Sequence, residues 1–407
     1  MKVIILINTN PYYSASASAN RWLTLIKGLS ELGMEIQIIV VGNYQSKKEK
    51  SGIETNKMNN GILIKYLNPK MVDKLWKRRF HKYIGNSIQN IKSKRLIKKE
   101  LIGFNGILWP ENDLAIWKMI PNLQNRPFRL IAEMSEFLDI HNFNTGNVLL
   151  RKLGDAKQKY FENYFIQNLD GLILMTKTLL RHYEKFPPPL PNFLHLPMTV
   201  DLNRFNENLD ILEGFDAPYI AFVGVMNDAK DGVDILIKAF GQIHTQFPAH
   251  KVYLVGSWNY DTPKHLKLIE EFSLQKKVFW KGEYSRDQIP AIIKNADLLA
   301  LPRPDSKQAQ GGFPTKLGEY LATGNPVCAT TVGEIPDYLV DGESVYFAKP
   351  GSIDSFSDAM QKALINTVES HEVGFNGRKI AETHFNKDVQ SKILYNFLKQ
   401  MINENSK

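Results

Sequence analysis

Short apolar runs alternate with amphipathic segments along most of the chain. The first two runs, VIILI and IQIIVV, flank a segment in which Trp22, Leu25 and Leu29 recur at helical spacing, and this predicts a helix over Arg21–Leu32 that ends at Gly33. Apolar runs of this length predict buried strands. Repeated several times, the alternation predicts parallel strands joined by helices, which is the pattern of a doubly wound α/β sheet.

The pattern restarts after a proline-rich stretch, 185–206, which predicts the approach to a domain linker. We therefore expect two doubly wound Rossmann-like domains, at 1–205 and 206–385. One more amphipathic pattern lies in the last segment, 386–407. Ligands of open α/β sheets bind beyond the carboxyl ends of the strands. Two such domains therefore predict a cleft whose site is formed by loops from both sides of the linker.

The composition supports this interpretation. A chain of 407 residues is too long for one ordinary core and favours two domains. No run of eighteen apolar residues argues for a membrane-spanning helix, and the apolar run at the N-terminus is too short for a convincing signal peptide. The single cysteine, Cys328, excludes an internal disulfide and fits a reducing compartment. We therefore expect a cytoplasmic protein.

The charge is divided unevenly along the chain. Basic residues exceed acidic ones by 14 in residues 1–200, whereas acidic residues are in excess by 5 in residues 201–407. The densest basic cluster, 70–100, has eleven Lys and Arg, with Leu75, Trp76, Phe80 and Ile84 at roughly helical spacing. It is either a solvated helical surface or a surface for an anionic partner, such as a phospholipid leaflet or a phosphate-bearing acceptor. Its aromatic residues do not interleave as a stacking platform would require, so we expect no nucleic acid.

The clearest candidate chemistry lies in GGFPTKLGEYLATG, residues 311–324. Its two leading glycines allow a ligand to approach the backbone closely. Pro314 suits the first helical position, and the first N–H groups of the helix would then be open to an anion, with Lys316 adding a positive charge. Glu319 lies one turn later on the same side and could accept hydrogen bonds from a ribose diol. The alternative is an ordinary surface helix with a Lys316–Glu319 ion pair.

This segment, with GNPVCATTVGEIPDYLVDGESVYF behind it, resembles the donor-binding region of glycosyltransferase family 4, whose members are two-domain retaining enzymes that use nucleotide sugars. Further resemblance lies in KVIILINTN at the start, in DGLILMTKTLLRHYEK and LPMTVDLNRF before the linker, and in YIAFVGVMNDAKDGVDILIKAF and VFWKGEYSRDQIPAIIKNADLLALP after it. It covers most of the chain and is weakest between residues 44 and 165. The resemblance implies a GT-B type fold, with two domains facing across a cleft and a C-terminal helix that crosses back to the N-terminal domain.

The resemblance also implies a donor site in the second domain. Glu319 matches the second of two glutamates that the family commonly carries here, whereas glycine stands at the position of the first; FPTK matches branches with a Phe-Pro-x-Lys pattern. The arginine that commonly follows the first glycine of this domain is absent, so lysines and another arginine would supply its charge. The expected donor contacts are Lys230, Gly282, Arg303, Gly311, Gly312, Phe313, Pro314, Thr315, Lys316, Leu317 and Glu319.

In the first domain the resemblance implies an acceptor site and a residue close to the reacting sugar. Ser16, Asn20 and Arg21 follow the first strand, where they could contact a diphosphate. The stretch LIAEMSEFLDIHNF takes the place of a segment with a His-Asp pair in many family members, which makes Ser135 and Glu136 the catalytic candidates beside Lys316. The alternative is that the carboxylates of this stretch cap the next helix and that His141 is an ordinary polar residue.

The implied reaction transfers a hexose, with retention of configuration, from a nucleoside diphosphate sugar to a hydroxyl of a glycan or lipid-linked acceptor. The resemblance places it in bacterial surface polysaccharide synthesis, peripherally at the inner face of the plasma membrane. A helix N-terminus and lysines can stabilise the departing diphosphate. No Asp-x-Asp pair and no His or Cys cluster with ligand spacing occurs in the sequence, so we expect neither a metal nor another cofactor.

Two alternatives remain open. One is a nucleotide-sugar 2-epimerase of the same fold, whose acid–base residues lie in other segments than those seen here. The other is a non-catalytic nucleotide-sugar-binding subunit that kept the cleft without the chemistry. Slow hydrolysis of the donor separates the three, because a transferase releases the nucleoside diphosphate and free sugar, an epimerase forms the epimer, and a binding protein does neither.

Overall fold

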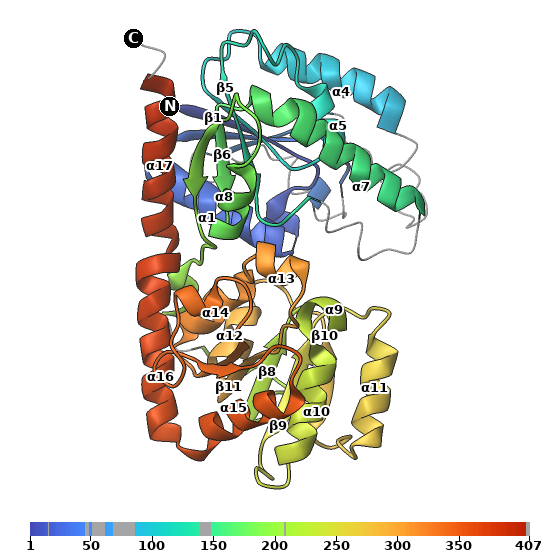
Figure 1. Cartoon of the computed structure of the whole chain (residues 1–407), viewed down its shortest axis with the longest axis vertical. Coiled ribbons are helices and arrows are strands. Elements are labelled where there is room, and N and C mark those ends of the chain that lie inside the picture. The colour runs from blue at the N-terminus through green and yellow to red at the C-terminus, as the bar shows by residue number, and fades with distance from the viewer. Residues whose placement is uncertain are drawn as a thin grey trace. The chain divides into compact units, whose positions relative to one another are not determined.

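The computed structural model describes residues 1–14, 16–44, 49–50, 62–67, 86–138, 148–206 and 209–403 (Figure 1). The chain divides into two compact units. Unit 1 comprises Met1–Leu196 and Gln390–Lys407, and unit 2 comprises Pro197–Val389.

Unit 1 is built on a parallel sheet, which in its described residues has the strand order β3-β2-β1-β4-β5-β6-β7. Its strands are β1 (Lys2–Ile7), β2 (Glu35–Val40), β3 (Ile62–Tyr66), β4 (Ile107–Pro110), β5 (Arg129–Met134), β6 (Gly171–Leu174) and β7 (Asn192–His195). Its helices are η1 (Pro11–Tyr13), α1 (Ala17–Glu31), α4 (Asn86–Glu100), α5 (Leu114–Met119), α7 (Val148–Tyr160), η2 (Phe161–Phe165), η3 (Ile166–Asn168) and α8 (Lys177–Tyr183).

Unit 2 repeats this architecture with the strand order β10-β9-β8-β11-β12-β13 in its described residues. Its strands are β8 (Tyr219–Val223), β9 (Lys251–Val255), β10 (Val278–Gly282), β11 (Leu298–Leu301), β12 (Val327–Thr330) and β13 (Tyr346–Ala348). Its helices are η4 (Leu202–Phe205), α9 (Asp228–Asp231), α10 (Val233–Ile243), α11 (Thr262–Glu271), α12 (Ile289–Lys294), α13 (Lys307–Gly311), α14 (Thr315–Thr323), η5 (Ile335–Asp337), α15 (Ile353–Ile365), α16 (Thr367–Ile380) and η6 (Ala381–Phe385). Two doubly wound Rossmann-like domains are thereby confirmed.

Helix α1 begins at Ala17, before the predicted start at Arg21. The hydroxyl of Ser16 accepts a hydrogen bond from the Ala19 N–H at 3.1 Å and so caps the helix in the way that serine favours. The periodicity of apolar residues missed this first turn because most of its residues face solvent. The end of the helix is as predicted, since Gly33 takes a left-handed φ of 82° that other residues rarely adopt.

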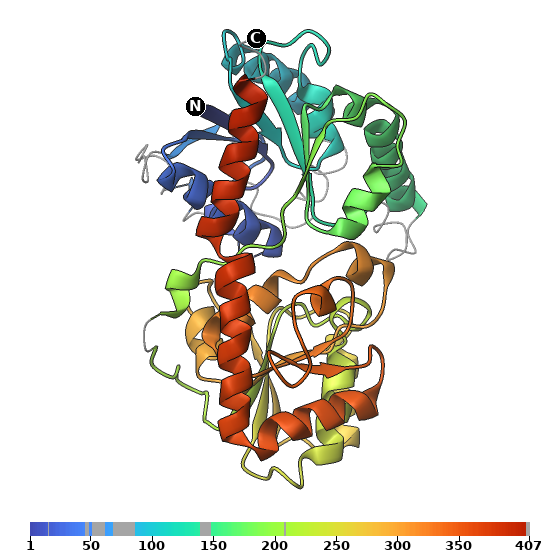
Figure 2. The same cartoon turned by 60° about the vertical axis from the view of Figure 1, so that its left-hand side comes forward.

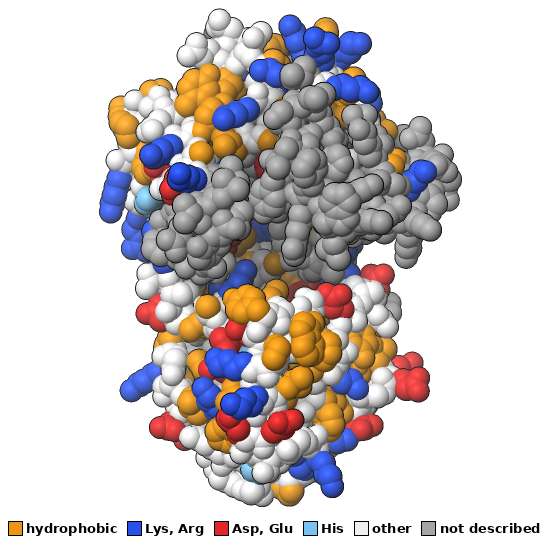
Figure 3. All heavy atoms as spheres, turned by 90° about the vertical axis from the view of Figure 1, so that its right-hand side faces the viewer, with side chains coloured by type: hydrophobic (Ala, Val, Ile, Leu, Met, Phe, Trp, Pro, Cys, Tyr) orange, Lys and Arg blue, Asp and Glu red, His pale blue; other side chains and the backbone are white. Residues whose placement is uncertain are grey.

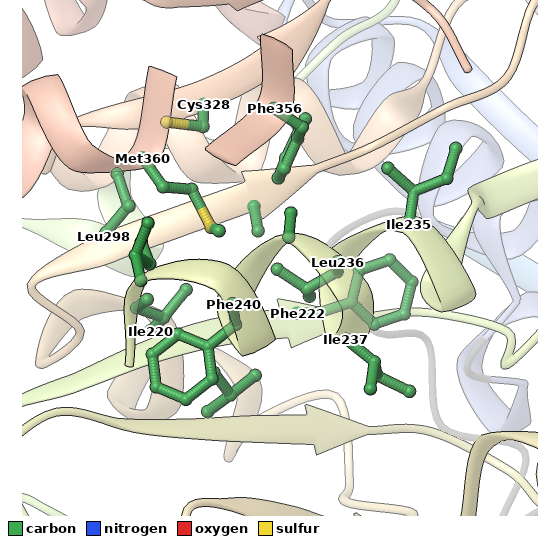
Figure 4. Packing of buried hydrophobic residues seen from close by; sticks show 14 of the residues in the cluster. Ile220, Phe222, Ile235, Leu236, Ile237, Phe240, Leu298, Cys328, Phe356 and Met360 are labelled. Carbon is green, nitrogen blue, oxygen red and sulfur yellow. The ribbon is translucent and has the colours of Figure 1, made fainter. Parts of the chain in front are cut away.

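The core of unit 2 lies between its sheet and helices α10 and α15. Phe240 of α10 and Phe356 of α15 pack there with Phe222 of β8, as Figure 4 shows. Cys328 of β12 is fully buried in the same core, and burial raises the pKa of its thiol well above the usual range. The thiol therefore serves as a small apolar side chain and is chemically inert.

The last helix, α17 (Lys387–Asn403), begins in unit 2 and continues as part of unit 1 (Figure 2). Leu394, Leu398 and Met401 are buried in a cluster with β1 and α1, and the Met401 carbonyl accepts a hydrogen bond from Arg129 at 3.0 Å. The prediction that the C-terminal helix crosses back to the N-terminal domain is thereby confirmed.

The division between the units falls between Leu196 and Pro197, whereas the sequence predicted a boundary at 205/206. The intervening residues belong to unit 2 because they pair with its C-terminal part. The N–H of Val200 donates to the Phe385 carbonyl at 2.8 Å, and the N–H of Lys387 donates to the Val200 carbonyl at 2.9 Å. Within the described residues, no helix is both long and apolar enough to span a bilayer.

Candidate functional site

Helix α14 carries the motif singled out from the sequence. Gly311 is the last residue of α13, and the N–H of Gly312 donates to the Gln308 carbonyl at 3.0 Å. Pro314 precedes α14 as its N-cap, with an extended ψ of 108°, and therefore is not the first helical residue that the sequence predicted. In the described part of the chain no side chain caps the helix, and the Leu317 N–H donates to the Pro314 carbonyl at 3.0 Å. The N–H groups of Thr315 and Lys316 are therefore left to water or a ligand.

Packing fixes α14 at the carboxyl end of β8. The Tyr320 hydroxyl accepts a hydrogen bond from the Val223 N–H at 2.8 Å. Phe313 packs its ring against Phe385, with centroids 5.4 Å apart, and Leu317 is fully buried. These side chains are therefore structural, and of the predicted donor contacts Phe313 and Leu317 can offer a ligand only backbone atoms.

The side chains of α14 that stay partly accessible are Thr315, Lys316 and Glu319. The Lys316 amine lies 2.8 Å from the carboxylate of Asp231 and 4.5 Å from the centroid of the Phe222 ring. It also lies against the backbone of Gly224, where a side chain would collide with it. Glycine directly after β8 is thus what lets the amine reach the end of the strand.

The cations Lys230, Arg303 and Lys316 lie close to one another beside the buried acid Asp231. Arg303, which follows β11, donates to the Lys230 carbonyl at 3.3 Å, and Asp231 is 2% exposed. Burial lowers the pKa of the Lys316 amine, Asp231 opposes this shift, and Arg303 and Lys230 lower the pKa further. The excess of positive charge beside an uncapped helix N-terminus is the chemistry of an anion site. Asp231 was missed by sequence reasoning, because nothing local marks it as the partner of Lys316.

Glu319 does not pair with Lys316, as it would in an ordinary surface ion pair, but with Arg204. Its carboxylate accepts a hydrogen bond from Arg204 of η4, which also donates to the Arg286 carbonyl at 2.7 Å. Burial lowers the pKa of Arg286, and the neighbouring Arg204 lowers it further, while Glu319 raises it. The Lys316–Glu319 pair is therefore replaced by two longer-range pairs. Arg204 and Arg286 were also missed, although both lie in segments that carried the family resemblance.

Gly282 ends β10 in a left-handed conformation, with φ 76°, and its carbonyl accepts from the Gly256 N–H at 2.8 Å. This hydrogen bond ties the end of β10 to the start of the loop that follows β9. A side chain at this position would meet no heavy atom within 4 Å, so close approach of a neighbour is not what the glycine is for. The left-handed φ itself is what favours glycine there.

Of the three residues predicted for the phosphate loop of unit 1, Ser16 and Arg21 make hydrogen bonds within the unit. Ser16 caps α1, and Asn20 is half-buried in the first turns of that helix. The Arg21 guanidinium is 4% exposed and donates to Glu133 at 2.7 Å and to the Leu196 carbonyl at 2.9 Å. Its charge is therefore balanced inside unit 1.

Ser135 and Glu136 directly follow β5, where the first is exposed and the second half-buried. Burial lowers the pKa of Lys157 on α7, and the carboxylates of Asp113, Glu136 and Glu111 raise it. Glu136 thus belongs to a charged group at the carboxyl edge of the sheet. His141 lies outside the described residues, as do the other residues between Leu138 and Val148, so capping of the next helix by these carboxylates stays an open alternative.

Most of the basic cluster 70–100 also lies outside the described residues, including Leu75, Trp76, Phe80 and Ile84. The described part is α4, whose basic side chains Lys92, Lys94, Arg95, Lys98 and Lys99 are all exposed. Figure 3 shows Lys and Arg side chains gathered where α4 lies. Among the described residues, no group of three or more His, Cys, Asp and Glu side chains could hold a metal ion.

Comparison with known proteins shows that most of unit 2 is similar to one family. Residues 209–380 match the family model described as glycosyl transferases group 1. A D-inositol 3-phosphate glycosyltransferase of Corynebacterium aurimucosum is 24% identical over 220 residues, which are 50% of this chain and 50% of that protein. An uncharacterized glycosyltransferase of Methanocaldococcus jannaschii is 24% identical over 229 residues, 56% of this chain and 58% of that protein. The chain thus spans about half the length of the curated relatives it matches.

Solved structures resemble the whole chain. Sucrose-phosphate synthase from Thermosynechococcus elongatus has a TM-score of 0.76 at 15% identity and covers 99% of this chain and 100% of its own. Anabaena HepE in complex with UDP and glucose has a TM-score of 0.70 at 13% identity, with 98% and 99% covered. WaaG, a glycosyltransferase involved in lipopolysaccharide biosynthesis, has a TM-score of 0.68 at 14% identity, with 98% and 99% covered. At these identities the likeness shows the fold, which is of the GT-B type.

Proposed function

We propose that this protein is a glycosyltransferase that moves a hexose from a nucleoside diphosphate sugar to a hydroxyl of a glycan or lipid-linked acceptor. The observation that carries the proposal is the Lys316 amine, held by Asp231 over Gly224, at the uncapped N-terminus of α14. This cluster lies wholly within the segment that matches the glycosyl transferase family model. A diphosphate is the anion that suits a helix N-terminus flanked by lysines and an arginine.

The residues of the cluster divide the binding of the donor among them. The diphosphate takes the N–H groups of Thr315 and Lys316 together with the Lys316 amine, and Lys230 and Arg303 add positive charge. Glu319 accepts hydrogen bonds from the ribose hydroxyls, while Arg204 orients its carboxylate. The HepE structures with UDP and with UDP-glucose support a nucleotide sugar as the ligand for this fold.

The chemistry follows from where charge develops. As the bond between the anomeric carbon and the phosphate oxygen breaks, negative charge grows on the diphosphate, and the cations and helix N–H groups stabilise it. The acceptor hydroxyl then bonds to the anomeric carbon on the face that the diphosphate leaves, and a phosphate oxygen takes its proton, which retains the configuration. The cations of this cluster serve the leaving group without a metal ion, which makes the proposed reaction metal-independent.

For the acceptor we propose unit 1, with Ser135 and Glu136 at the carboxyl edge of its sheet as the polar groups that meet the sugar or the acceptor. The exposed cations of α4 fit an acceptor presented at an anionic surface, such as the inner face of a bacterial plasma membrane. A relative supports this class of product: the putative colanic acid biosynthesis glycosyltransferase WcaL of Salmonella typhimurium is 26% identical over 151 residues, 36% of each chain.

The test is hydrolysis of nucleotide sugars by the purified protein without an acceptor. A panel of UDP-, GDP- and ADP-hexoses is incubated with enzyme, and the products are separated by anion-exchange chromatography. Slow release of nucleoside diphosphate and free sugar from one donor supports the transferase. Formation of a 2-epimer would indicate an epimerase, and binding without any product would indicate a non-catalytic subunit. Glu319→Gln serves as the control that removes the activity if it resides in this site.

A further inference from the structure

Helix α9 is tied to the rest of unit 2 through both of its aspartates. Asp231, at its end, contacts the Lys316 amine of α14 at 2.8 Å. Asp228, at its start, contacts α11 on the other side. Because α9 is a single turn, any shift of Asp228 moves Lys230 and Asp231 with it. Figure 1 shows α9 next to α10 and α11.

Four hydrogen bonds hold the carboxylate and the N–H of Asp228 within the described residues. Its carboxylate accepts from the ring of His265 at 2.6 Å, from the Lys264 amine at 2.6 Å and from the N–H of Asp234 at 3.1 Å. Its own N–H donates to the carboxylate of Asp261 at 3.1 Å. Burial would raise the pKa of Asp228, but the hydrogen bonds from His265 and Lys264 hold it well below its usual range. The carboxylate is therefore ionised and firmly held.

A buried histidine at position 265 lowers the stability of the fold more than an apolar side chain would. Its side chain is 2% exposed, and its Nε2 faces the Asp228 carboxylate, so Nε2 carries the proton. Its Nδ1 is buried with no hydrogen-bond partner in the described part of the chain. An unsatisfied buried polar atom destabilises the fold, and an aliphatic side chain would fill the same place without it. The imidazole is thus retained at a cost in stability, and its one bond goes to Asp228.

We propose that His265 is a positioning residue for the phosphate-binding cluster. Through Asp228 it sets the place of α9, so that Lys230 and the Asp231–Lys316 pair stand ready for the diphosphate before the ligand arrives. The inference rests on the proposed function, since it assigns the cluster to a diphosphate. It adds a residue that touches neither donor nor acceptor and that lies outside the motif of α14.

The experiment compares three variants and one control variant in binding to UDP and to uridine by calorimetry, with GDP and guanosine used if UDP does not bind. His265→Leu removes the bond to Asp228, and Asp228→Asn weakens it from the other side. His265→Gln keeps an N–H donor close to the position of Nε2. Lys267→Ala, on the exposed face of the same helix, is the matched control. Thermal unfolding of each variant shows that it is folded.

We expect His265→Leu and Asp228→Asn to bind UDP about tenfold more weakly. This is the loss expected when one charge-assisted hydrogen bond from the cluster to the diphosphate is made in a poorer geometry. Uridine binding should be unchanged, and His265→Gln should regain most of the UDP affinity. Equal losses for UDP and uridine, or UDP binding like that of the wild type in both variants, would overturn the inference while leaving the proposed function in place. Failure of the wild type to bind any nucleoside diphosphate would instead overturn the proposed function.

Discussion

Replacement of Lys316 by methionine tests the diphosphate site most directly. Methionine keeps much of the length of the side chain and removes the charge, so the packing on Phe222 is largely preserved. A charge-assisted hydrogen bond contributes about 1.5–3 kcal/mol. At about 1.4 kcal/mol per factor of ten, nucleoside diphosphate binding should weaken roughly 10- to 150-fold, whereas nucleoside binding should remain the same.

The structure also predicts a side effect that must be separated from the binding loss. Without Lys316, the Asp231 carboxylate, with only 3% of its side chain exposed, loses the cation that it contacts. A buried charged group left without its partner costs about 1–3 kcal/mol or more, which for a domain of this size lowers the Tm by roughly 2–4 °C per kcal/mol. The double variant Lys316→Met/Asp231→Asn removes both charges and should regain most of that stability.

Isothermal titration calorimetry of the wild type and both variants with a nucleoside diphosphate and its nucleoside decides the matter. The double variant should be nearly as stable as the wild type and yet still bind the diphosphate weakly, because it lacks Lys316 as the single variant does. Equal weakening of nucleoside and nucleoside diphosphate would refute the assignment, as would a double variant with normal diphosphate affinity. In either case Lys316 would be a structural partner of Asp231 and nothing more.

Three further predictions concern other parts of the molecule. Glu319→Gln should weaken binding of a ribonucleotide and leave that of its 2′,3′-dideoxy analogue almost unchanged; equal effects on both ligands would exclude a ribose contact. Because burial lowers the pKa of Lys316 below the ordinary 10.5, the amine should lose its proton, and the protein its diphosphate affinity, at lower pH than an exposed lysine would; calorimetry from about pH 7 to about pH 10 should show this decline in the wild type and not in Lys316→Met. Replacing Lys94, Arg95, Lys98 and Lys99 by glutamine should reduce sedimentation with anionic vesicles at low salt without affecting donor hydrolysis, since each cation near such a surface contributes about 1 kcal/mol; a wild type that ignores these vesicles would refute the membrane hypothesis. The same prediction holds for Lys77, Arg78, Arg79 and Lys82, which lie outside the described residues.

Local pattern was sufficient for the elements and for the fold class. Apolar runs of four to six residues became parallel strands, and the spacing of Trp22, Leu25 and Leu29 became the buried face of α1. In α14, Leu317, Tyr320 and Leu321 likewise recur at helical spacing, and all three are buried in the core. Such features depend on contacts within a strand or one helical turn, so the sequence of that segment alone specifies them.

Local pattern also located the helix that carries the candidate site, but not the partners of its charged side chains. Lys316 and Glu319 are three residues apart, and in an isolated helix they would pair with each other. In the folded unit each one pairs elsewhere, Lys316 with Asp231 and Glu319 with Arg204. Sequence reasoning therefore identified two functional candidates but not the partners that hold them.

The reason is the arrangement of strands around β8. The order β10-β9-β8-β11 brings α9, which follows β8 and carries Asp231, next to α14, although three strands and their helices separate the two in the chain. Tyr320 then fixes the rotation of α14 by its bond to Val223, and this rotation points Lys316 at Gly224 and Asp231. A buried charge must have a partner within a few ångströms. The order of the strands and the rotation of one helix therefore decide which residue becomes that partner. Neither can be predicted from the spacing of residues along the chain.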